Sequence, residues 1–156
     1  MSIEIERKFL VKNLNYKQEA YKKVYIKQGF LNSDKERVVR VRLKDDAGFL
    51  TIKGKSNASG TSRFEWEKEI SVKDAQDLFD LCEQGVIEKY RYLIKKDKYT
   101  FEVDEFFGDN KGLLVAEIEL SDESEVFEKP EWLGLEVTGQ VKYYNSNLSK
   151  LPFKDW

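Results

Sequence analysis

Apolar and polar residues alternate along most of this chain, in short runs separated by turn residues. Neighbouring side chains of a β-strand point to opposite faces, so this period of two is typical of strands with one apolar and one polar face. Turn signals such as Asn32-Ser33-Asp34 and Asp45-Asp46-Ala47-Gly48 indicate sequential antiparallel hairpins. The pattern predicts eight strands, over residues 3–11, 24–31, 36–43, 49–55, 63–71, 86–95, 99–107 and 112–120.

Helical periodicity is confined to shorter parts of the chain. Ser71 and Asp74 resemble a capping box, and apolar residues then recur at helical spacing until Gly85, which predicts one helix. Shorter helices are expected over residues 16–22, over an acidic segment from Ser121 to just before Pro130, and over residues 141–150. The predicted fold class is α+β and mainly β.

Composition narrows the class of protein. A length of 156 residues suits one domain, here residues 1–156. The net charge of -2 lacks the basic footprint of a general nucleic-acid binder, so no nucleic acid is expected as a partner. No signal core and no apolar run of membrane-spanning length is present, so no membrane association is expected. The single cysteine, Cys82, excludes disulfides within the chain, and we expect a cytoplasmic protein.

Like-charged residues two positions apart recur on one face of seven predicted strands. The basic pairs are Arg40 and Arg42, Lys53 and Lys55, and Lys89 and Arg91; the acidic pairs are Glu4 and Glu6, Glu65 and Glu67, Glu102 and Asp104, and Glu117 and Glu119. Like charges at this spacing repel each other, so the repetition is costly unless something of opposite sign lies between the strands. A closed eight-stranded antiparallel β-barrel with these pairs inside, and its apolar face turned outward against helices, satisfies all of them.

The expected occupants of such an interior are a cation for the carboxylates and a polyanion for the basic residues. The chain has no histidine, so a metal would be held by oxygen ligands, which Mg²⁺ prefers. Arginine binds phosphate with two hydrogen bonds and lysine acts as a point charge. The residues alone leave three interpretations open: a metal-dependent site for a phosphate chain, a polar barrel with structural ion pairs only, and a polyanion binder without hydrolytic activity.

The ordered motifs resemble those of the CYTH superfamily, the triphosphate tunnel metalloenzymes. Glu4, Glu6 and Lys8 match its signature Glu-x-Glu-x-Lys. Further matches are Gln28-Gly29-Phe30-Leu31, Arg40-Val41-Arg42, Thr51-Ile52-Lys53-Gly54, Glu65-Trp66-Glu67, Glu88-Lys89-Tyr90-Arg91, Glu102-Val103-Asp104, Glu117-Ile118-Glu119 and Glu136-Val137-Thr138. The resemblance implies an eight-stranded tunnel that binds a triphosphate with Mg²⁺ or Mn²⁺.

The resemblance also implies roles for single residues. The implied metal ligands are Glu4, Glu6, Asp104, Glu117 and Glu119. The implied phosphate-binding residues are Lys8, Arg40, Arg42, Lys53, Lys55, Arg91 and Lys142. Lys89 matches a lysine that orients or deprotonates the attacking water. Glu65, Glu67 and Glu102 are expected to assist a second metal or to brace the basic residues.

The implied activity is metal-dependent hydrolysis of inorganic tripolyphosphate. The alternatives are hydrolysis of a nucleoside or thiamine triphosphate, class IV-type adenylyl cyclase chemistry, and a polyphosphate-binding module that does not hydrolyse. Two positions depart from the family pattern. Phe30 replaces a tyrosine that partners the lysine, with Tyr25 and Tyr143 as candidate substitutes, and Gln140 replaces an acid. Phe30 favours the binding module, and the oligomeric state stays open, a homodimer included.

Overall fold

The computed structural model describes residues 2–156. Its strands are β1 (Ser2–Val11), β2 (Lys22–Asn32), β3 (Arg37–Lys44), β4 (Ala47–Gly54), β5 (Ser62–Ile70), β6 (Ile87–Lys96), β7 (Tyr99–Phe106), β8 (Leu114–Glu119) and β9 (Leu133–Glu136). Its helices are α1 (Tyr16–Glu19), α2 (Val72–Phe79) and α3 (Asn145–Leu148), with 3-10 turns η1 (Gly108–Asn110), η2 (Val141–Tyr143) and η3 (Phe153–Asp155). All eight predicted strands are present, and β9 was not predicted.

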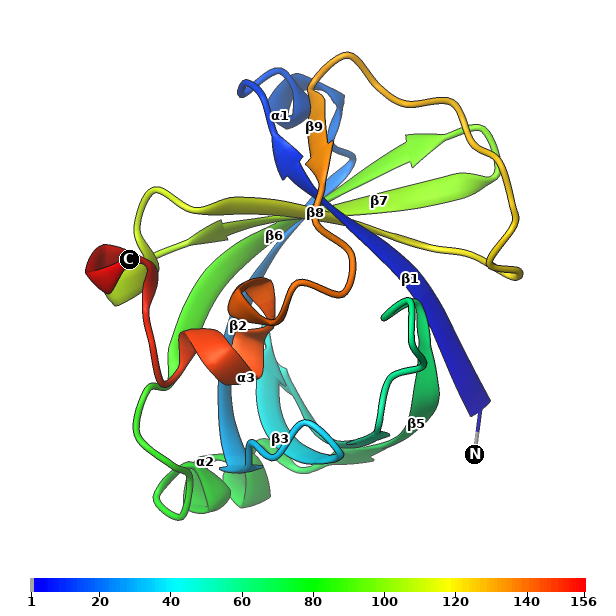
Figure 1. The fold of residues 1–156 in the computed structure, drawn as a ribbon. Helices are drawn as coiled ribbons and strands as arrows, with labels where there is room; N and C mark the ends of the chain where they lie inside the picture. The colour runs from blue at the N-terminus through cyan, green and yellow to red at the C-terminus, as the bar shows by residue number, and fades with distance from the viewer. Residues whose placement is uncertain (1) are drawn as a thin grey trace.

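Strands β1 to β8 form a closed antiparallel barrel. Hydrogen-bonded neighbours follow the order β5-β4-β3-β2-β6-β7-β8-β1, and the pairing of β5 with β1 closes the ring. Figure 1 looks into this ring, with α2 outside it. The predicted fold class and barrel are therefore confirmed.

Strand β1 is where the ring closes. One of its edges pairs with β8, and the other is shared by β5, which pairs with residues 2–5, and β9, which pairs with Phe9 and Val11. Between these two partners, the backbone N–H of Glu6 donates to the carbonyl oxygen of Thr61 at 2.9 Å, and that of Lys8 donates to Thr138 Oγ1 at 2.9 Å. The strand that carries the Glu-x-Glu-x-Lys residues is thus fixed along both edges.

An apolar cluster covers the outer face of β1, β6, β7 and β8. Phe9, Phe101 and Trp132 at its centre are fully buried, and the rings of Phe101 and Trp132 meet edge to face with centroids 5.5 Å apart. The other members are Tyr16, Tyr92, Ile94, Val103, Ala116, Ile118, Leu120, Phe127 and Leu133. The apolar face of the alternation therefore points outward, as predicted, but its cover is α1, β9 and the loop that precedes β9 rather than long helices.

Helix α2 packs outside β3 and β4. The Ser71 hydroxyl caps it by accepting a hydrogen bond from the backbone N–H of Asp74 at 3.0 Å. Gly48 of β4 permits the close approach, since a Cβ there would lie 3.0 Å from Cβ of Ala75. The helix ends at Phe79, short of the predicted end near Gly85, because the chain tightens into turns in which the Cys82 N–H donates to the Phe79 carbonyl.

Two other predicted helices are corrected by the structure. The acidic segment after Ser121 is not helical. Glu123 accepts a hydrogen bond from Asn57 at 2.8 Å and Glu125 accepts one from the Tyr99 hydroxyl, so two of its carboxylates tie the segment to other parts of the chain. The predicted helix over residues 141–150 is divided into η2 and α3.

No helix within residues 2–156 is long and apolar enough to cross a bilayer.

The segment that contains η2 and α3 packs against the inner face of the barrel. Tyr143 and Leu148 are buried beside Phe30, Ile87 and Phe106. Ile87 and Phe106 lie two positions from Lys89 and Asp104 and therefore share the inner face with them. The rest of this inner cluster is Val38, Leu113, Val115 and Val137. One end of the interior is therefore filled by apolar side chains, and the charged side chains face the remaining space.

Candidate active site

A cavity of about 170 Å³ lies inside the barrel and is lined almost entirely by charged side chains. The lining residues are Glu4, Glu6, Lys8, Phe30, Val38, Arg40, Arg42, Lys44, Lys53, Arg63, Glu65, Glu67, Arg91, Glu102, Glu117, Glu119, Tyr144, Asn145 and Ser146. Acidic and basic residues are equally represented in this set. The arrangement of the two signs therefore determines what the cavity can bind.

Arg42 is a buried cation whose partner is an amide and not a carboxylate. It is buried, and its Nε and Nη2 donate to Gln28 Oε1 at 3.0 and 2.8 Å, since the two residues are directly opposite on β2 and β3. It forms no ion pair with a carboxylate of residues 2–156. Burial lowers the pKa of Arg42 well below its ordinary value, and the charges of Arg40 and Arg91 lower it further.

Arg40 lies two residues away on the same face of β3. Its Nη2 donates to Thr51 Oγ1 at 3.2 Å and lies 3.7 Å from Glu67 Oε2, whereas its buried Nε has no partner in the described structure. Burial also lowers the pKa of Arg40, and the charge of Arg91 adds to this effect. The two arginines therefore form a buried positive wall, in which Arg40 has one ion pair, with Glu67, and Arg42 has no carboxylate partner among residues 2–156.

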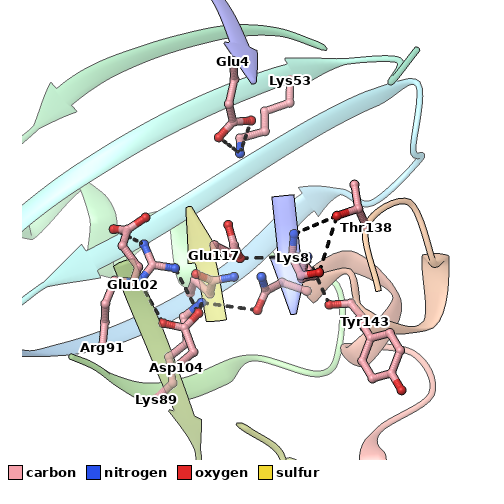
Figure 2. Close-up of polar contacts among 12 residues, drawn as sticks. Glu4, Lys8, Lys53, Lys89, Arg91, Glu102, Asp104, Glu117, Thr138 and Tyr143 are labelled. Atoms are coloured by element: carbon pink, nitrogen blue, oxygen red, sulfur yellow. Dashed lines mark hydrogen bonds and ion pairs between the residues drawn. The ribbon is translucent and has the colours of Figure 1, made fainter. Parts of the chain in front are cut away.

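Lys53 and Arg63 meet the first acid of β1. Lys53 Nζ donates to both oxygens of Glu4, at 3.0 and 2.9 Å, and lies 3.5 Å from Glu65 Oε2. Arg63 Nε lies 3.5 Å from Glu4 Oε2. Figure 2 shows the pair formed by Glu4 and Lys53. Glu4 is thus held by cations in this state.

The other acids of β1 and β8 face one another. Glu6 lies opposite Glu119, and Lys8 lies opposite Glu117, across the two strands. The pKa of Glu117 is raised, first by burial and then by the charge of Glu6. The pKa of Glu119 is raised by burial and by the charges of neighbouring acids, of which Glu4 is the largest. Negative charge is therefore concentrated on the inner face of β1 and β8, which we call the acidic wall.

Lys8 extends between the acidic wall and the C-terminal segment. Its Nζ lies 3.9 Å from Glu117 Oε1 and donates to the carbonyl oxygen of Tyr143 at 3.4 Å (Figure 2). The same Nζ lies 4.9 Å from the ring centre of Tyr144, a distance suited to a cation–π contact. The C-terminal segment therefore helps to position a predicted phosphate-binding lysine.

Arg91, Lys89 and Asp104 form a buried ionic group (Figure 2). Asp104 accepts hydrogen bonds from Arg91 Nε at 2.8 Å, from Arg91 Nη2 at 2.9 Å and from Lys89 Nζ at 2.6 Å. Arg91 Nη1 also donates to Glu102 at 3.2 Å, and Lys89 Nζ donates to Asn145 Oδ1 at 3.4 Å. Arg91, Glu102 and Asn145 line the cavity, whereas Lys89 and Asp104 lie behind its wall.

This group has perturbed titration behaviour. Burial lowers the pKa of Lys89 from 10.5 to about 7; the charge of Asp104 opposes this, and those of Arg91 and Arg42 add to it. Burial alone would raise the pKa of Asp104, but the charges of Arg91 and Lys89 hold it below its ordinary value. Asp104 is therefore ionised, and it is the shared partner of Arg91 and Lys89.

The structure brings most of the sequence-predicted site residues together. The following line the cavity: Glu4, Glu6, Lys8, Arg40, Arg42, Lys53, Glu65, Glu67, Arg91, Glu102, Glu117 and Glu119. Lys55 lies beyond the end of β4, is exposed and pairs with Glu36 at 3.5 Å. Lys142 is exposed in η2, with Nζ 4.4 Å from the ring centre of Trp156. Neither residue reaches the cavity in this structure.

Sequence reasoning missed five polar lining residues, namely Arg63, Lys44, Tyr144, Asn145 and Ser146. Arg63 and Lys44 had a signal, because each lies two positions from a predicted residue on the same strand, Glu65 and Arg42 respectively. Tyr144, Asn145 and Ser146 had none, since they reach the cavity from an irregular segment.

The inner face of the closed barrel thus places carboxylates opposite buried arginines, and residue types of this kind bind polyphosphates and divalent cations. The family model of the CYTH domain matches residues 2–152, so the chain belongs to the CYTH family. It is 51% identical over 157 residues to an inorganic triphosphatase of Acetivibrio thermocellus, covering 100% of this chain and 99% of that protein.

A second relative is an inorganic triphosphatase of Nitrosomonas europaea, 34% identical over 150 residues, with 94% of this chain and 96% of that protein covered. Among solved structures, the crystal structure of the inorganic triphosphatase NE1496 matches with a TM-score of 0.66 and 32% identity, covering 94% of this chain and 97% of that one. The fold and the family predicted from the sequence are thereby confirmed.

Proposed function

We propose that this protein is a metal-dependent inorganic triphosphatase, which hydrolyses a phosphoanhydride bond of tripolyphosphate inside the barrel. The observation that carries the proposal is the positive wall of Arg40 and Arg42. Leaving a buried charge without a partner of opposite sign is costly, and phosphate oxygens are the ligands that a guanidinium group binds best. The names of the two relatives above point to the same substrate class.

The carboxylates of β1 and β8 fit a divalent cation. Burial, and then the charge of Glu6, raise the pKa of Glu117, and a divalent cation would relieve the repulsion between these two acids. Among residues 2–156, no three acidic side chains already surround one metal position. Mg²⁺ in phosphate-handling sites is commonly held by one or two carboxylates together with substrate oxygens and water. One or two of Glu6, Glu117 and Glu119 would hold it here, and Mn²⁺ has the same ligand preference.

When bound, the cation would neutralise charge on the phosphoryl oxygens. The protein supplies positioning and further charge neutralisation, which is most of what phosphoryl transfer requires. Arg40, Arg42 and Arg91 bind phosphate oxygens from one side, and Lys8 and Lys53 bind them from the β1 side. Asp104 holds Arg91 and Lys89 in place.

Lys89 is the proposed base. In the reaction, a water oxygen bonds to a terminal phosphorus while the bridging P–O bond breaks, and pyrophosphate leaves with the bonding electron pair. The water proton passes to the neutral amine of Lys89. Burial favours that neutral form and lowers the pKa of Lys89 to about 7, close to the pH at which a general base works best. No histidine is available for this role.

One observation favours a polyphosphate-binding module instead. Lys89 lies behind the cavity wall, paired with Asp104, and Phe30 offers no hydroxyl to the site. A protein that binds tripolyphosphate without activating water would show these features. A hydrolase and a binding module would both bind tripolyphosphate, but only the hydrolase would cleave it. Turnover must therefore be measured.

The test incubates the protein with Mg²⁺ and tripolyphosphate, ATP or thiamine triphosphate in parallel, and assays phosphate, pyrophosphate and cyclic AMP. We expect phosphate from tripolyphosphate at the highest rate, no cyclic AMP, and loss of activity when a chelator removes the metal. Tight binding of tripolyphosphate without phosphate release would establish the binding module and refute the hydrolase. Cyclic AMP formation from ATP would establish the cyclase.

A further inference from the structure

We propose that Tyr144 is a positioning residue for Lys8 and Arg63, and that the face of its ring directs these two cations toward a bound tripolyphosphate. This inference rests on the binding step of the proposed function and does not depend on hydrolysis. Tyr144 directly precedes α3 and lines the cavity together with both cations. It also lines two neighbouring pockets, so it lies at the margin of the cavity.

The two cations reach the ring from neighbouring strands. Lys8 Nζ, on β1, lies 4.9 Å from the ring centre of Tyr144, and the guanidinium carbon of Arg63, on β5, lies 5.8 Å from it. Both distances fall within the range of about 6 Å over which the negative face of an aromatic ring attracts a cation. One ring therefore contacts two of the basic side chains that line the cavity.

An aromatic ring holds a cation without cancelling its charge. Lys8 Nζ donates to the carbonyl oxygen of Tyr143 at 3.4 Å, and its carboxylate partner, Glu117, is farther away at 3.9 Å. Arg63 Nε lies 3.5 Å from Glu4 Oε2. A carboxylate in place of the ring would offset much of the attraction of these cations for phosphate. The ring instead fixes their direction and leaves their charge for the ligand.

The ring is itself held in place. The backbone carbonyl of Tyr144 accepts hydrogen bonds from the N–H groups of Asn147 and Leu148, both at 2.9 Å. Tyr143 and Leu148 are buried in the inner apolar cluster. At the far end of the ring, a Cβ on Gly60 would lie 3.4 Å from the Tyr144 hydroxyl oxygen, so the hydroxyl lies beside the loop between β4 and β5. A change confined to the ring should therefore leave the segment in place.

The test replaces Tyr144 by phenylalanine that carries zero, one, two or three ring fluorines, and measures the affinity for tripolyphosphate by calorimetry. Each fluorine weakens the negative face of the ring and changes its shape little. We expect Tyr144→Phe to bind within about twofold of the wild type, and each fluorine to raise the Kd, to about fivefold to thirtyfold with three fluorines. Tyr144→Leu, which removes the ring, should bind as weakly as the trifluorinated form.

The same phenylalanine series at Tyr21 is the matched control, since that side chain is exposed and does not line the cavity. Its members should keep the wild-type affinity. At Tyr144, an affinity that does not change with fluorination would show that the ring only packs against its neighbours. Tighter binding with fluorination would show that the ring competes with phosphate for the cations. Either result would overturn the positioning role.

Hydrolysis of tripolyphosphate by the wild type, assayed in parallel, tests the proposed function separately. Binding without phosphate release would refute the hydrolase, whereas the fluorination series alone decides the role of Tyr144. Absence of tripolyphosphate binding by the wild type would overturn both.

Discussion

The substitution Gln28→Glu tests whether the charge of Arg42 is left uncompensated in order to receive phosphate. Gln28 Oε1 accepts two hydrogen bonds from Arg42, at 3.0 and 2.8 Å, and both residues are buried. Gln28 Nε2 is buried without a partner, so its replacement by an oxygen removes no hydrogen bond in the described structure. The glutamate has the shape of the glutamine and places a carboxylate against the guanidinium.

The substitution should keep the stability of the ligand-free protein and weaken the binding of tripolyphosphate. The carboxylate compensates Arg42, whose pKa is lowered chiefly by burial, so the ligand-free protein should not lose stability. A phosphate that binds the far side of the guanidinium would lie about 7 Å from the new charge. At an effective dielectric constant of about 20, each unit of phosphate charge is then repelled by about 2 kcal/mol, which weakens binding by roughly thirtyfold.

Calorimetric titration with tripolyphosphate measures the affinity, and thermal unfolding without ligand measures the stability. Gln18→Glu, an exposed site on α1, is the control for a change of one unit in net charge and should alter the affinity by less than about twofold. Wild-type affinity in Gln28→Glu would refute the assignment of Arg42 as a phosphate ligand. A large loss of stability would refute the claim that its charge lacks compensation.

Four further substitutions test other parts of the site and of the fold. Lys89→Ala should lower kcat about a hundredfold or more with little change in affinity, whereas Arg40→Ala should mainly weaken tripolyphosphate binding; equal effects on both quantities would make Lys89 another phosphate ligand. Glu117→Gln should raise the Mg²⁺ concentration needed for half-maximal activity by about tenfold or more, and an unchanged requirement would place the metal elsewhere. Trp132→Ala should cost about 3–5 kcal/mol of unfolding free energy in urea denaturation, and a loss below about 1 kcal/mol would contradict its place at the centre of the outer cluster.

The barrel was predictable from the sequence because its strands carry a strict alternation of charged and apolar residues. The two-residue period alone correctly predicts the inward-facing side chains of β3 and β8, which are Arg40 and Arg42, and Glu117 and Glu119. The alternation fails where the strand ends. Lys55 follows Gly54, the last residue of β4, and so does not continue the inward row.

Alternation predicts the face of the strand on which a side chain lies, but it does not predict whether that side chain reaches the cavity. Lys89 and Asp104 face inward, as predicted, but the register between β6 and β7 places Arg91 directly opposite Asp104. That pairing engages Asp104 and leaves Lys89 behind the wall. Strand pairing of this kind depends on contacts between distant parts of the chain, which one sequence does not display.

The C-terminal half of the site was the least predictable part. Strand β9 spans only Leu133–Glu136, too short for a period to be recognised. Asn145 reaches the cavity because Tyr143 and Leu148 anchor the segment on Phe30, an arrangement fixed by tertiary packing. Phe30 also has a structural role, since its ring supports the segment that brings the Asn145 amide to Lys89.

Whether water cleaves tripolyphosphate inside this barrel can be measured by hydrolysis in ¹⁸O-labelled water with Mg²⁺, followed by ³¹P NMR. We expect equal amounts of phosphate and pyrophosphate, with the label in the phosphate and none in the pyrophosphate. Tripolyphosphate that binds tightly and remains intact would rule out hydrolysis, and label in the pyrophosphate would rule out attack of water on the terminal phosphorus.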